Sequence, residues 1–131
     1  MIPTTTTIIG IIEYRVVEVK KPWDEAQKYC EDLGEHLADI KSEAEETFLE
    51  RNVFHGYNTS IWLGATDVES EGTFVWWDGT NVSDFYVNWS PSQPNNYDGM
   101  EHCLKSAKVK DRWQWRDGKC FTKLFSLCEF D

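Results

Sequence analysis

Basic side chains and long apolar runs are both scarce in this chain. Lys and Arg number 13 against 23 Asp and Glu, which gives a formal net charge of −10. Such a surface repels phosphate backbones, so nucleic acid is excluded as an expected partner. The apolar stretch at residues 8–12 is broken by Gly10 and is far too short to span a bilayer, so no membrane span is predicted.

Catalytic motifs are absent as well. The chain has no GxSxG, no HExxH and no phosphate-binding glycine loop. The three histidines, His36, His55 and His102, lack the spacing of a metal-binding helix, and we expect them at the surface. The sequence therefore predicts a binding module rather than an enzyme.

No secretory leader is visible, because Met1 is followed by Ile2, Pro3 and a threonine run rather than by basic residues. Either a leader has been removed or the protein is cytosolic. The four cysteines favour the first alternative, since two disulfides imply an oxidising compartment. Four cysteines allow three pairings, and the absence of a CxxC pair argues against a zinc ribbon. We therefore expect a secreted, extracellular domain.

Three glycosylation triplets agree with secretion. They begin at Asn58, Asn81 and Asn88, and Pro91 disfavours the third. The domain is therefore expected to be a glycoprotein.

Two helices are predicted in the first half of the chain. Apolar residues recur every three or four positions over residues 23–33, and Gly34 is suited to end that helix. Ser42 and Glu45 form a capping box that opens a second helix. Its buried side is predicted to consist of Ala44, Phe48 and Leu49.

Short strands dominate the rest of the chain. They are expected at residues 13–20, 61–65, 73–77, 102–106, 113–116 and 125–130. Residues 78–100 are rich in Gly, Pro, Asn, Asp and Ser and indicate a long loop, and its Trp89 and the nearby Cys103 favour an ordered one. The pattern predicts one α+β domain over residues 13–131, preceded by a flexible or strand-extending segment at residues 1–12.

Several motifs in this order resemble those of the C-type lectin family. They are residues 23–30 (WDEAQKYC), 37–42 (LADIKS), 62–65 (WLGA), 93–95 (QPN), 115–117 (WRD) and 127–130 (LCEF). The resemblance covers roughly residues 13–131. It implies the C-type-lectin-like fold of the short form with two disulfides, in which two helices flank a mainly antiparallel sheet with a long ordered loop.

The resemblance also implies which cysteines pair. Cys30 is expected to pair with Cys128, and Cys103 with Cys120. Each bridge is expected to contribute roughly 3–5 kcal/mol by loop entropy. Because all four cysteines are then used internally, any homo-oligomer is expected to be non-covalent.

In this family the long loop binds Ca²⁺, and two sugar hydroxyls complete the ion's coordination. The matching ligands here are Gln93, Asn95, Glu101 and Asp117, which offer amide and carboxylate oxygens. In lectins of the family the intervening proline, here Pro94, is cis. The resemblance thus predicts calcium-dependent carbohydrate binding.

Arg116 departs from the family pattern, which has Asn at this position. Arg offers no acceptor, and at about 4 Å from a divalent ion it would cost about 8 kcal/mol at an effective dielectric of 20. Ion binding therefore requires the guanidinium to turn into solvent. Alternatively, Arg116 pairs with Glu101 or Asp117 and replaces the ion.

The sugar motif is a hybrid, because Gln-Pro-Asp accompanies galactose in the family and Glu-Pro-Asn accompanies mannose. Tyr97 stands where galactose-type members often carry a Trp that stacks on the sugar. The predicted sugar contacts are Gln93, Asn95, Tyr97, Glu101, Arg116 and Asp117. Galactose or N-acetylgalactosamine is therefore favoured over mannose-type glycans.

A weak auxiliary metal site is also implied, at Asp67, Glu71 and Asn96, with Glu101 and His102 nearby. Asn96 and His102 stand there in place of carboxylates, which is why the site is expected to be weak or empty. The alternative function is a calcium-independent module of the same fold that binds a protein, mineral or ice surface, and Arg116 favours that alternative.

Overall fold

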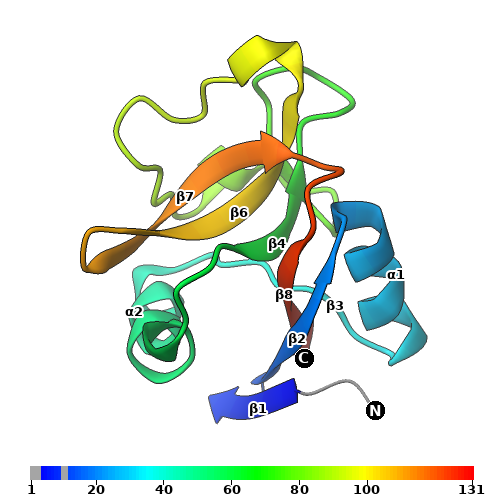
Figure 1. Cartoon of the computed structure of the whole chain (residues 1–131), viewed down its shortest axis with the longest axis vertical. Coiled ribbons are helices and arrows are strands. Elements are labelled where there is room, and N and C mark those ends of the chain that lie inside the picture. Colours follow the sequence, from blue (N-terminus) through cyan, green and yellow to red (C-terminus); the bar gives the residue numbers. More distant parts are fainter. Residues whose placement is uncertain (1–3, 10–11) are drawn as a thin grey trace.

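Two helices flank one mixed sheet in the computed structural model, which describes residues 4–9 and 12–131 (Figure 1). The helices are α1 (Trp23–Asp32) and α2 (Glu43–Asn52). The strands are β1 (Thr4–Ile9), β2 (Ile12–Lys21), β3 (His36–Leu37), β4 (Ile61–Thr66), β5 (Val75–Trp76), β6 (Glu101–Val109), β7 (Arg112–Lys119) and β8 (Leu124–Phe130). The predicted α+β class is confirmed.

The sheet is mainly antiparallel, as predicted. Its strand order is β1-β2-β8-β4-β6-β7, with β3 paired to β8 and β5 to β4. Only the β4–β8 pair is parallel among the described strands. In Figure 1 the strands β1, β2 and β8 gather at the bottom, and the loops before β6 form the top. Within the described residues, no helix has the length and apolar character needed to cross a membrane.

Local sequence accounts for both helices. In α1 the buried residues are Ala26 and Cys30, and the acidic Asp24 and Glu25 lie in the first turn, where the helix dipole favours them. Helix α2 begins after Ser42, whose hydroxyl accepts a hydrogen bond from the backbone N–H of Glu45 at 3.1 Å. Both predicted helices are therefore confirmed.

The buried side of α2 differs from the prediction. Ala44 is exposed, whereas Glu46 is only 4% exposed. The Glu46 carboxylate accepts a hydrogen bond from the indole N–H of Trp115 at 2.9 Å, which compensates part of the cost of its burial. Similarly, His36 is buried rather than at the surface, because its ring stacks on Trp77 with a centroid distance of 3.9 Å.

Aromatic side chains fill the core beneath the long loop. Trp115 is fully buried and meets Trp76, Tyr86 and Trp89 edge-on, with ring centroids 5.7–5.9 Å apart. Edge-to-face pairs of this kind add to the stabilisation from buried area. The predicted strand at 73–77 is shorter than expected, since only the two residues of β5 pair with β4.

Gly64 in β4 allows close packing of the segment after β3. A Cβ atom at this position would collide with the carbonyl group of Leu37. The Gly64 N–H instead donates to the carbonyl oxygen of Ala38 at 2.8 Å. The WLGA motif thus joins β4 to the chain that follows α1.

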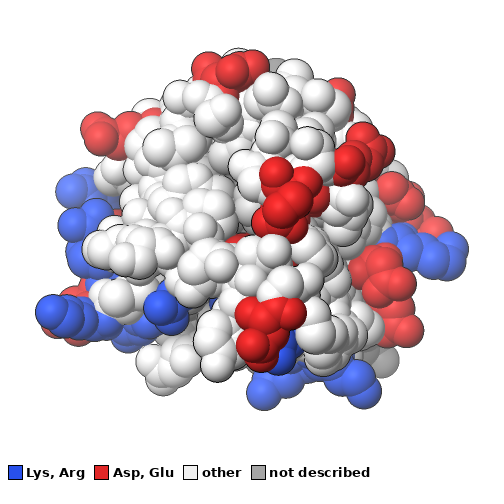
Figure 2. All heavy atoms as spheres, turned by 90° about the horizontal axis from the view of Figure 1, so that it is seen from above, with Lys and Arg blue, Asp and Glu red and all other residues white. Residues whose placement is uncertain are grey.

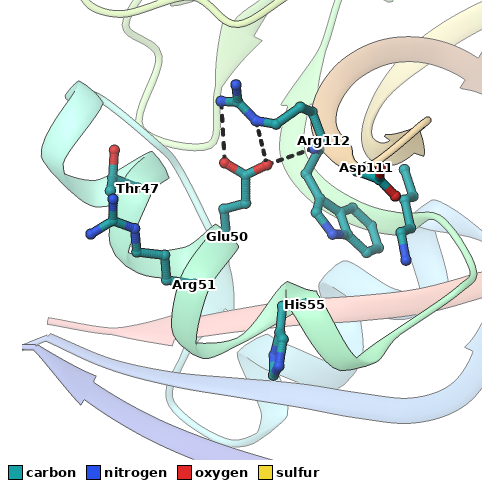
Figure 3. A pocket seen from close by; sticks show the side chains of 8 residues that line it. Thr47, Glu50, Arg51, His55, Asp111 and Arg112 are labelled. Atoms are coloured by element: carbon teal, nitrogen blue, oxygen red, sulfur yellow. Dashed lines mark hydrogen bonds and ion pairs between the residues drawn. The ribbon is translucent and has the colours of Figure 1, made fainter.

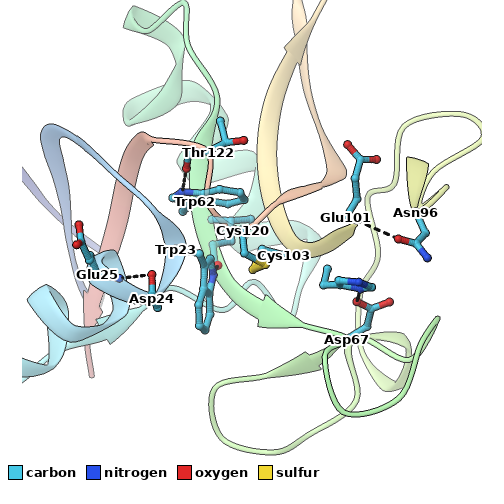
Figure 4. Close-up of a disulfide and its surroundings, with 12 residues drawn as sticks. Trp23, Asp24, Glu25, Trp62, Asp67, Asn96, Glu101, Cys103, Cys120 and Thr122 are labelled. Carbon is cyan, nitrogen blue, oxygen red and sulfur yellow. Dashed lines mark hydrogen bonds and ion pairs between the residues drawn. A yellow bond between two sulfur atoms is a disulfide. The ribbon is translucent and has the colours of Figure 1, made fainter. Parts of the chain in front are cut away.

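The two disulfides pair as the family resemblance implies. Cys30–Cys128 joins α1 to β8, and Cys103–Cys120 joins β6 to the residue after β7. Figure 4 shows the second bridge lying between Trp62 on one side and the loop residue Asn96 on the other. It therefore links β6 to the end of β7, near the point where the long loop joins the sheet. The division at residues 12 and 13 stays a prediction, although Thr4–Ile9 pairs with β2 as strand β1.

Candidate functional site

Strand β7 anchors the long loop by hydrogen bonds. Trp115 donates its backbone N–H to the Asn88 carbonyl oxygen at 2.8 Å, and its own carbonyl oxygen accepts from Ser90 at 2.9 Å. Further along, the two carboxylate oxygens of Asp117 accept the backbone N–H groups of Asn95 at 3.2 Å and Asn96 at 2.6 Å. The loop is thus ordered by groups on β7.

The four predicted ligands come together in one hollow, which we call the loop pocket. Its volume is about 190 Å³. It is lined by Gln93, Asn95, Tyr97, Glu101, Lys105, Arg116 and Asp117. The Gln93–Pro94 peptide bond is cis. Gln93 and Asn95, on either side of Pro94, line the same pocket as the carboxylates that approach from β6 and β7.

Three of the four predicted ligands, Gln93, Glu101 and Asp117, accept a hydrogen bond from a backbone N–H group. The Gln93 amide oxygen accepts the Asp117 N–H at 3.3 Å, and a Glu101 carboxylate oxygen accepts the Tyr97 N–H at 3.1 Å. Amide and carboxylate oxygens have more than one lone pair, so each can accept a hydrogen bond and still coordinate a cation. Hard oxygen donors of this kind fit Ca²⁺ and do not favour a soft metal.

Two cationic side chains share the loop pocket with these oxygens. Lys105 and Arg116 are directly opposite each other on β6 and β7. Gly118 makes room for the lysine, since a Cβ there would approach the Lys105 Nζ to 3.3 Å. Burial lowers the pKa of Lys105; Glu101 opposes that shift, and Arg116 adds to it. Lys105 was not among the pocket residues predicted from the sequence.

Arg116 is not neutralised by its neighbours. Its side chain is exposed, and in the part of the chain that the structure describes it forms no ion pair with Glu101 or Asp117. Of the two arrangements expected from sequence, the one in which this guanidinium replaces the ion by pairing with a carboxylate is absent. The pocket carboxylates remain available.

The predicted auxiliary residues do not all come together. Asp67, Glu71 and His102, which we call the histidine cluster, hold their ligand atoms within 4.8 Å of one another. Hydrogen bonding to Asp67 raises the pKa of His102, and the nearby charge of Glu71 acts in the same direction. Asn96 instead uses its amide oxygen to accept the Glu101 backbone N–H at 3.0 Å (Figure 4).

Further charged groups lie away from the loop pocket. A hollow of about 600 Å³ opens between α2 and the β6–β7 hairpin, where the Glu50 carboxylate binds Arg112 at 3.0 Å (Figure 3). A second group of buried residues, His36, Asp39 and Glu129, lies between β3 and β8, and sequence reasoning missed it. Burial raises the pKa of Glu129 to about 9.

The loop end of the molecule carries both signs of charge. Figure 2 shows acidic side chains spread over this face and basic ones along its margins. Tyr97 is 62% exposed on the rim of the loop pocket. The arrangement is a shallow, polar, solvent-accessible hollow with one aromatic ring beside it, which is suited to reversible binding of a polar ligand.

Together the disulfide framework and the oxygen-lined loop define a small binding domain of the lectin type. The family model for the lectin C-type domain matches residues 19–130 of the sequence. Perlucin from Haliotis laevigata is 35% identical over 117 residues, covering 85% of this chain and 71% of perlucin. Salivary C-type lectin 2 from Aedes albopictus is 38% identical, covering 82% and 76%. The chain therefore belongs to the C-type lectin family.

Solved structures agree with this assignment. The carbohydrate-recognition domain of the mouse scavenger receptor C-type lectin superposes with a TM-score of 0.86 at 30% identity, covering 96% of this chain and 93% of that domain. A calcium-independent type II antifreeze protein superposes with a TM-score of 0.82 at 27% identity, covering 99% and 94%. The predicted fold is thus confirmed. Members of the family are non-enzymatic binding proteins, so the chain is a binding module and not an enzyme.

Proposed function

We propose that this domain binds carbohydrate in a calcium-dependent manner at the loop pocket. The observation that carries the proposal is the convergence of four oxygen-bearing side chains, Gln93, Asn95, Glu101 and Asp117, on one hollow beside a cis proline. Calcium takes six to eight oxygens, so four protein donors leave positions for water or for sugar hydroxyls. When bound, the ion would supply a coordination site for two neighbouring hydroxyls.

The protein's own groups position these donors. Asp117 is only 3% exposed and fixes the backbone at Asn95 and Asn96, so the loop does not have to become ordered when ligand arrives. Pre-organisation of this kind reduces the entropic cost of binding. The same amide and carboxylate groups can donate to or accept from the sugar hydroxyls that face the ion.

Galactose or N-acetylgalactosamine is the sugar class that we propose, in preference to mannose-type glycans. The support is the pairing of Gln93 with an exposed aromatic ring, Tyr97, on the same pocket. The apolar face of galactose can stack on such a ring, which contributes to binding in addition to the hydrogen bonds. A single shallow site of this size suggests a dissociation constant of about 1 mM, so useful binding requires clustered sugars.

The test is a melting curve recorded in calcium and in chelator, followed by chromatography on immobilised galactose and immobilised mannose. At 100 times its dissociation constant, calcium should stabilise the protein by about 2.7 kcal/mol. Retention on galactose with elution by chelator is expected. An unchanged melting temperature in millimolar calcium would reject calcium dependence, and retention on mannose alone would reject the sugar assignment.

The alternative is a calcium-independent surface that binds protein, mineral or ice. The specific observation in its favour is the pair of cations, Lys105 and Arg116, in the loop pocket, because they repel a divalent ion. Similarity to a calcium-independent antifreeze protein shows that the fold accommodates such a function. Ice recrystallisation and carbonate-crystal growth assays in chelator distinguish this alternative, since the lectin hypothesis predicts no effect in either.

Secretion and glycosylation are also proposed. Asn58 and Asn81 are exposed, whereas the Asn88 amide already donates to the Trp113 carbonyl oxygen at 3.0 Å. We therefore expect glycans at Asn58 and Asn81 but not at Asn88. Mass spectrometry of the protein expressed in a secretory host, with and without glycosidase, checks this expectation.

A further inference from the structure

The histidine cluster has a geometry that a calcium site does not require. The Nδ1 atom of His102 lies 3.0 Å from a carboxylate oxygen of Asp67 and 3.2 Å from a carboxylate oxygen of Glu71. Calcium prefers oxygen ligands, and an imidazole nitrogen is a ligand for Zn²⁺ and similar metals. The replacement of a carboxylate by His102 therefore changes the chemistry of this position.

The other ring nitrogen fixes which atom is free to coordinate. The Nε2 atom of His102 lies 3.2 Å from the Gly99 carbonyl oxygen, which can only accept a hydrogen bond. With the proton on Nε2, the lone pair of Nδ1 faces the two carboxylates. A hydrogen bond from the second ring nitrogen to a backbone carbonyl is the usual arrangement around a metal-bound histidine.

Asp67 cannot turn away from this concentration of lone pairs. Its side chain is only 1% exposed, and its second oxygen accepts the Gly72 N–H at 2.8 Å. The first oxygen is thereby directed at the His102 ring. Three electron-rich atoms this close repel one another unless a proton or a metal ion lies among them, and the candidates are a second proton on the His102 ring, a proton on the Glu71 carboxyl group, or a metal ion.

We propose that Asp67, Glu71 and His102 bind Zn²⁺ or a similar transition metal in preference to Ca²⁺. Around a tetrahedral zinc ion with bonds of about 2.0–2.1 Å, neighbouring ligand atoms are about 3.3 Å apart. The separations of 3.0 and 3.2 Å are close to that value. The Glu71 side chain is 53% exposed, so the cluster is open to solvent and a water molecule can complete the tetrahedron. None of the four calcium ligands proposed for the loop pocket is used, and the proposal does not rest on the lectin function.

The test is isothermal titration of chelator-treated protein with ZnCl₂ and, separately, with CaCl₂. One equivalent of zinc should bind, and His102→Asn should weaken zinc binding by more than about tenfold. His55→Asn is the matched control, because His55 is exposed and lies at the distant hollow near α2, and it should leave zinc binding unchanged. Glu71→Gln, at an exposed position that should tolerate the change, is also expected to weaken zinc binding.

Nitrogen NMR of the histidine rings provides an independent readout. Zinc should shift the Nδ1 signal of His102 while Nε2 keeps its proton. Zinc binding that is equally strong in His102→Asn and Glu71→Gln would overturn the proposal, as would a ring that stays doubly protonated in excess zinc. Galactose retention in calcium without zinc tests the lectin function separately, so the two proposals can fail independently.

Discussion

At the scale of single residues, Arg116 places an exposed positive charge beside the oxygens of the loop pocket. Arg116→Asn removes an exposed cation that lines the pocket and adds an amide oxygen. Repulsion of about 2 kcal/mol at 4 Å in bulk water corresponds to roughly thirtyfold in affinity, so calcium binding should strengthen by about tenfold to thirtyfold. Isothermal titration with CaCl₂ measures the change.

The matched control for that experiment is Lys110→Asn. Lys110 is exposed at the β6–β7 turn and adopts a positive φ of 58°, which Asn tolerates. It removes the same net charge without touching the pocket, so calcium affinity should stay constant. If Arg116→Asn also leaves the affinity constant, the guanidinium does not face the ion and the pocket assignment is wrong.

Glu46 should make stability depend on pH near neutrality. Burial raises its pKa to about 7, and the hydrogen bond from Trp115 opposes that shift. Because the folded value exceeds the unfolded value of about 4.5, the folded state holds the extra proton between the two. The stabilisation is complete below about pH 4.5 and is lost as the pH rises through 7. Glu46→Gln should remove the share that Glu46 contributes, about 3 kcal/mol, while the share of Glu129, whose pKa burial raises to about 9, should persist.

Urea unfolding between pH 4 and pH 8 measures that slope. Glu50 provides a contrast of opposite sign: burial opposes ionisation, but Arg112 and the Trp113 N–H lower the pKa of Glu50 overall. The ionised Glu50 carboxylate stabilises the folded state at neutral pH, and this stabilisation is lost on acidification. Glu50→Gln should therefore lower the free energy of unfolding at pH 7. A slope between pH 4.5 and 7 that is as steep in Glu46→Gln as in the wild type would show that Glu46 does not contribute to it.

At the scale of single residues, the pocket ligands could be predicted from the sequence, whereas the buried polar side chains could not. The ligand set of the loop pocket was predicted from the resemblance to the C-type lectin family, which rests on short local motifs that can be read from the sequence. The burial of Glu46 and His36 was not predicted, since each depends on a distant indole, Trp115 or Trp77. A polar side chain can be buried in a core when a hydrogen-bond or stacking partner compensates the loss of its hydration. Which partner is within reach depends on the tertiary fold.

At the scale of elements, one carboxylate on β7 holds the long loop. Asp117→Asn leaves a side chain with only one acceptor oxygen for the two N–H groups of Asn95 and Asn96. Hydrogen bonds to charged groups contribute about 1.5–3 kcal/mol, so the unfolding free energy should fall by about that amount. Amide hydrogen exchange at residues 95 and 96 should accelerate, which a deuterium-exchange experiment detects.

Asp98→Asn is the control within the same loop. Asp98 is exposed and adopts a positive φ of 59°, which Asn also tolerates. Exchange at residues 95 and 96 should be unaffected. Unchanged protection in Asp117→Asn as well would mean that the loop is held by the backbone pairing at Trp115 rather than by the carboxylate.

Elements with a strong local signal were predicted well. The capping box at Ser42 and Glu45 located the start of α2, and Pro22 located the end of β2. The strand predicted at 73–77 is reduced to β5 because strand length is determined by the available partner, here the end of β4. That the long loop is ordered was predicted from Trp89 and the nearby Cys103. The hydrogen bonds that hold the loop in place come from β7 and were not predicted.

At the scale of the whole molecule, the C-terminal strand closes the fold. Strand β8 lies between β2 and β4, so the last residues of the chain are central to the sheet. Its parallel pairing with β4 joins segments about sixty residues apart, a long-range contact that local patterns do not specify. The family resemblance implied a mainly antiparallel sheet, and the parallel pairing of β4 with β8 was not predicted.

The two disulfides should therefore differ in what they stabilise. Cys30–Cys128 spans 98 residues and Cys103–Cys120 spans 17. By loop entropy, their removal should cost about 5 and about 3 kcal/mol respectively. Urea unfolding of the paired alanine variants checks these values.

Calcium affinity should follow the opposite order. Cys103 lies two residues from Glu101, and Cys120 three residues from Asp117, so the short bridge holds two of the proposed ligands in register. The long bridge lies at α1 and β8, away from the loop pocket. Loss of the short bridge should therefore weaken calcium binding more, despite costing less stability. If the variant without the long bridge binds calcium less tightly while still folded, the pocket depends on the whole sheet and not on the local tie between β6 and β7.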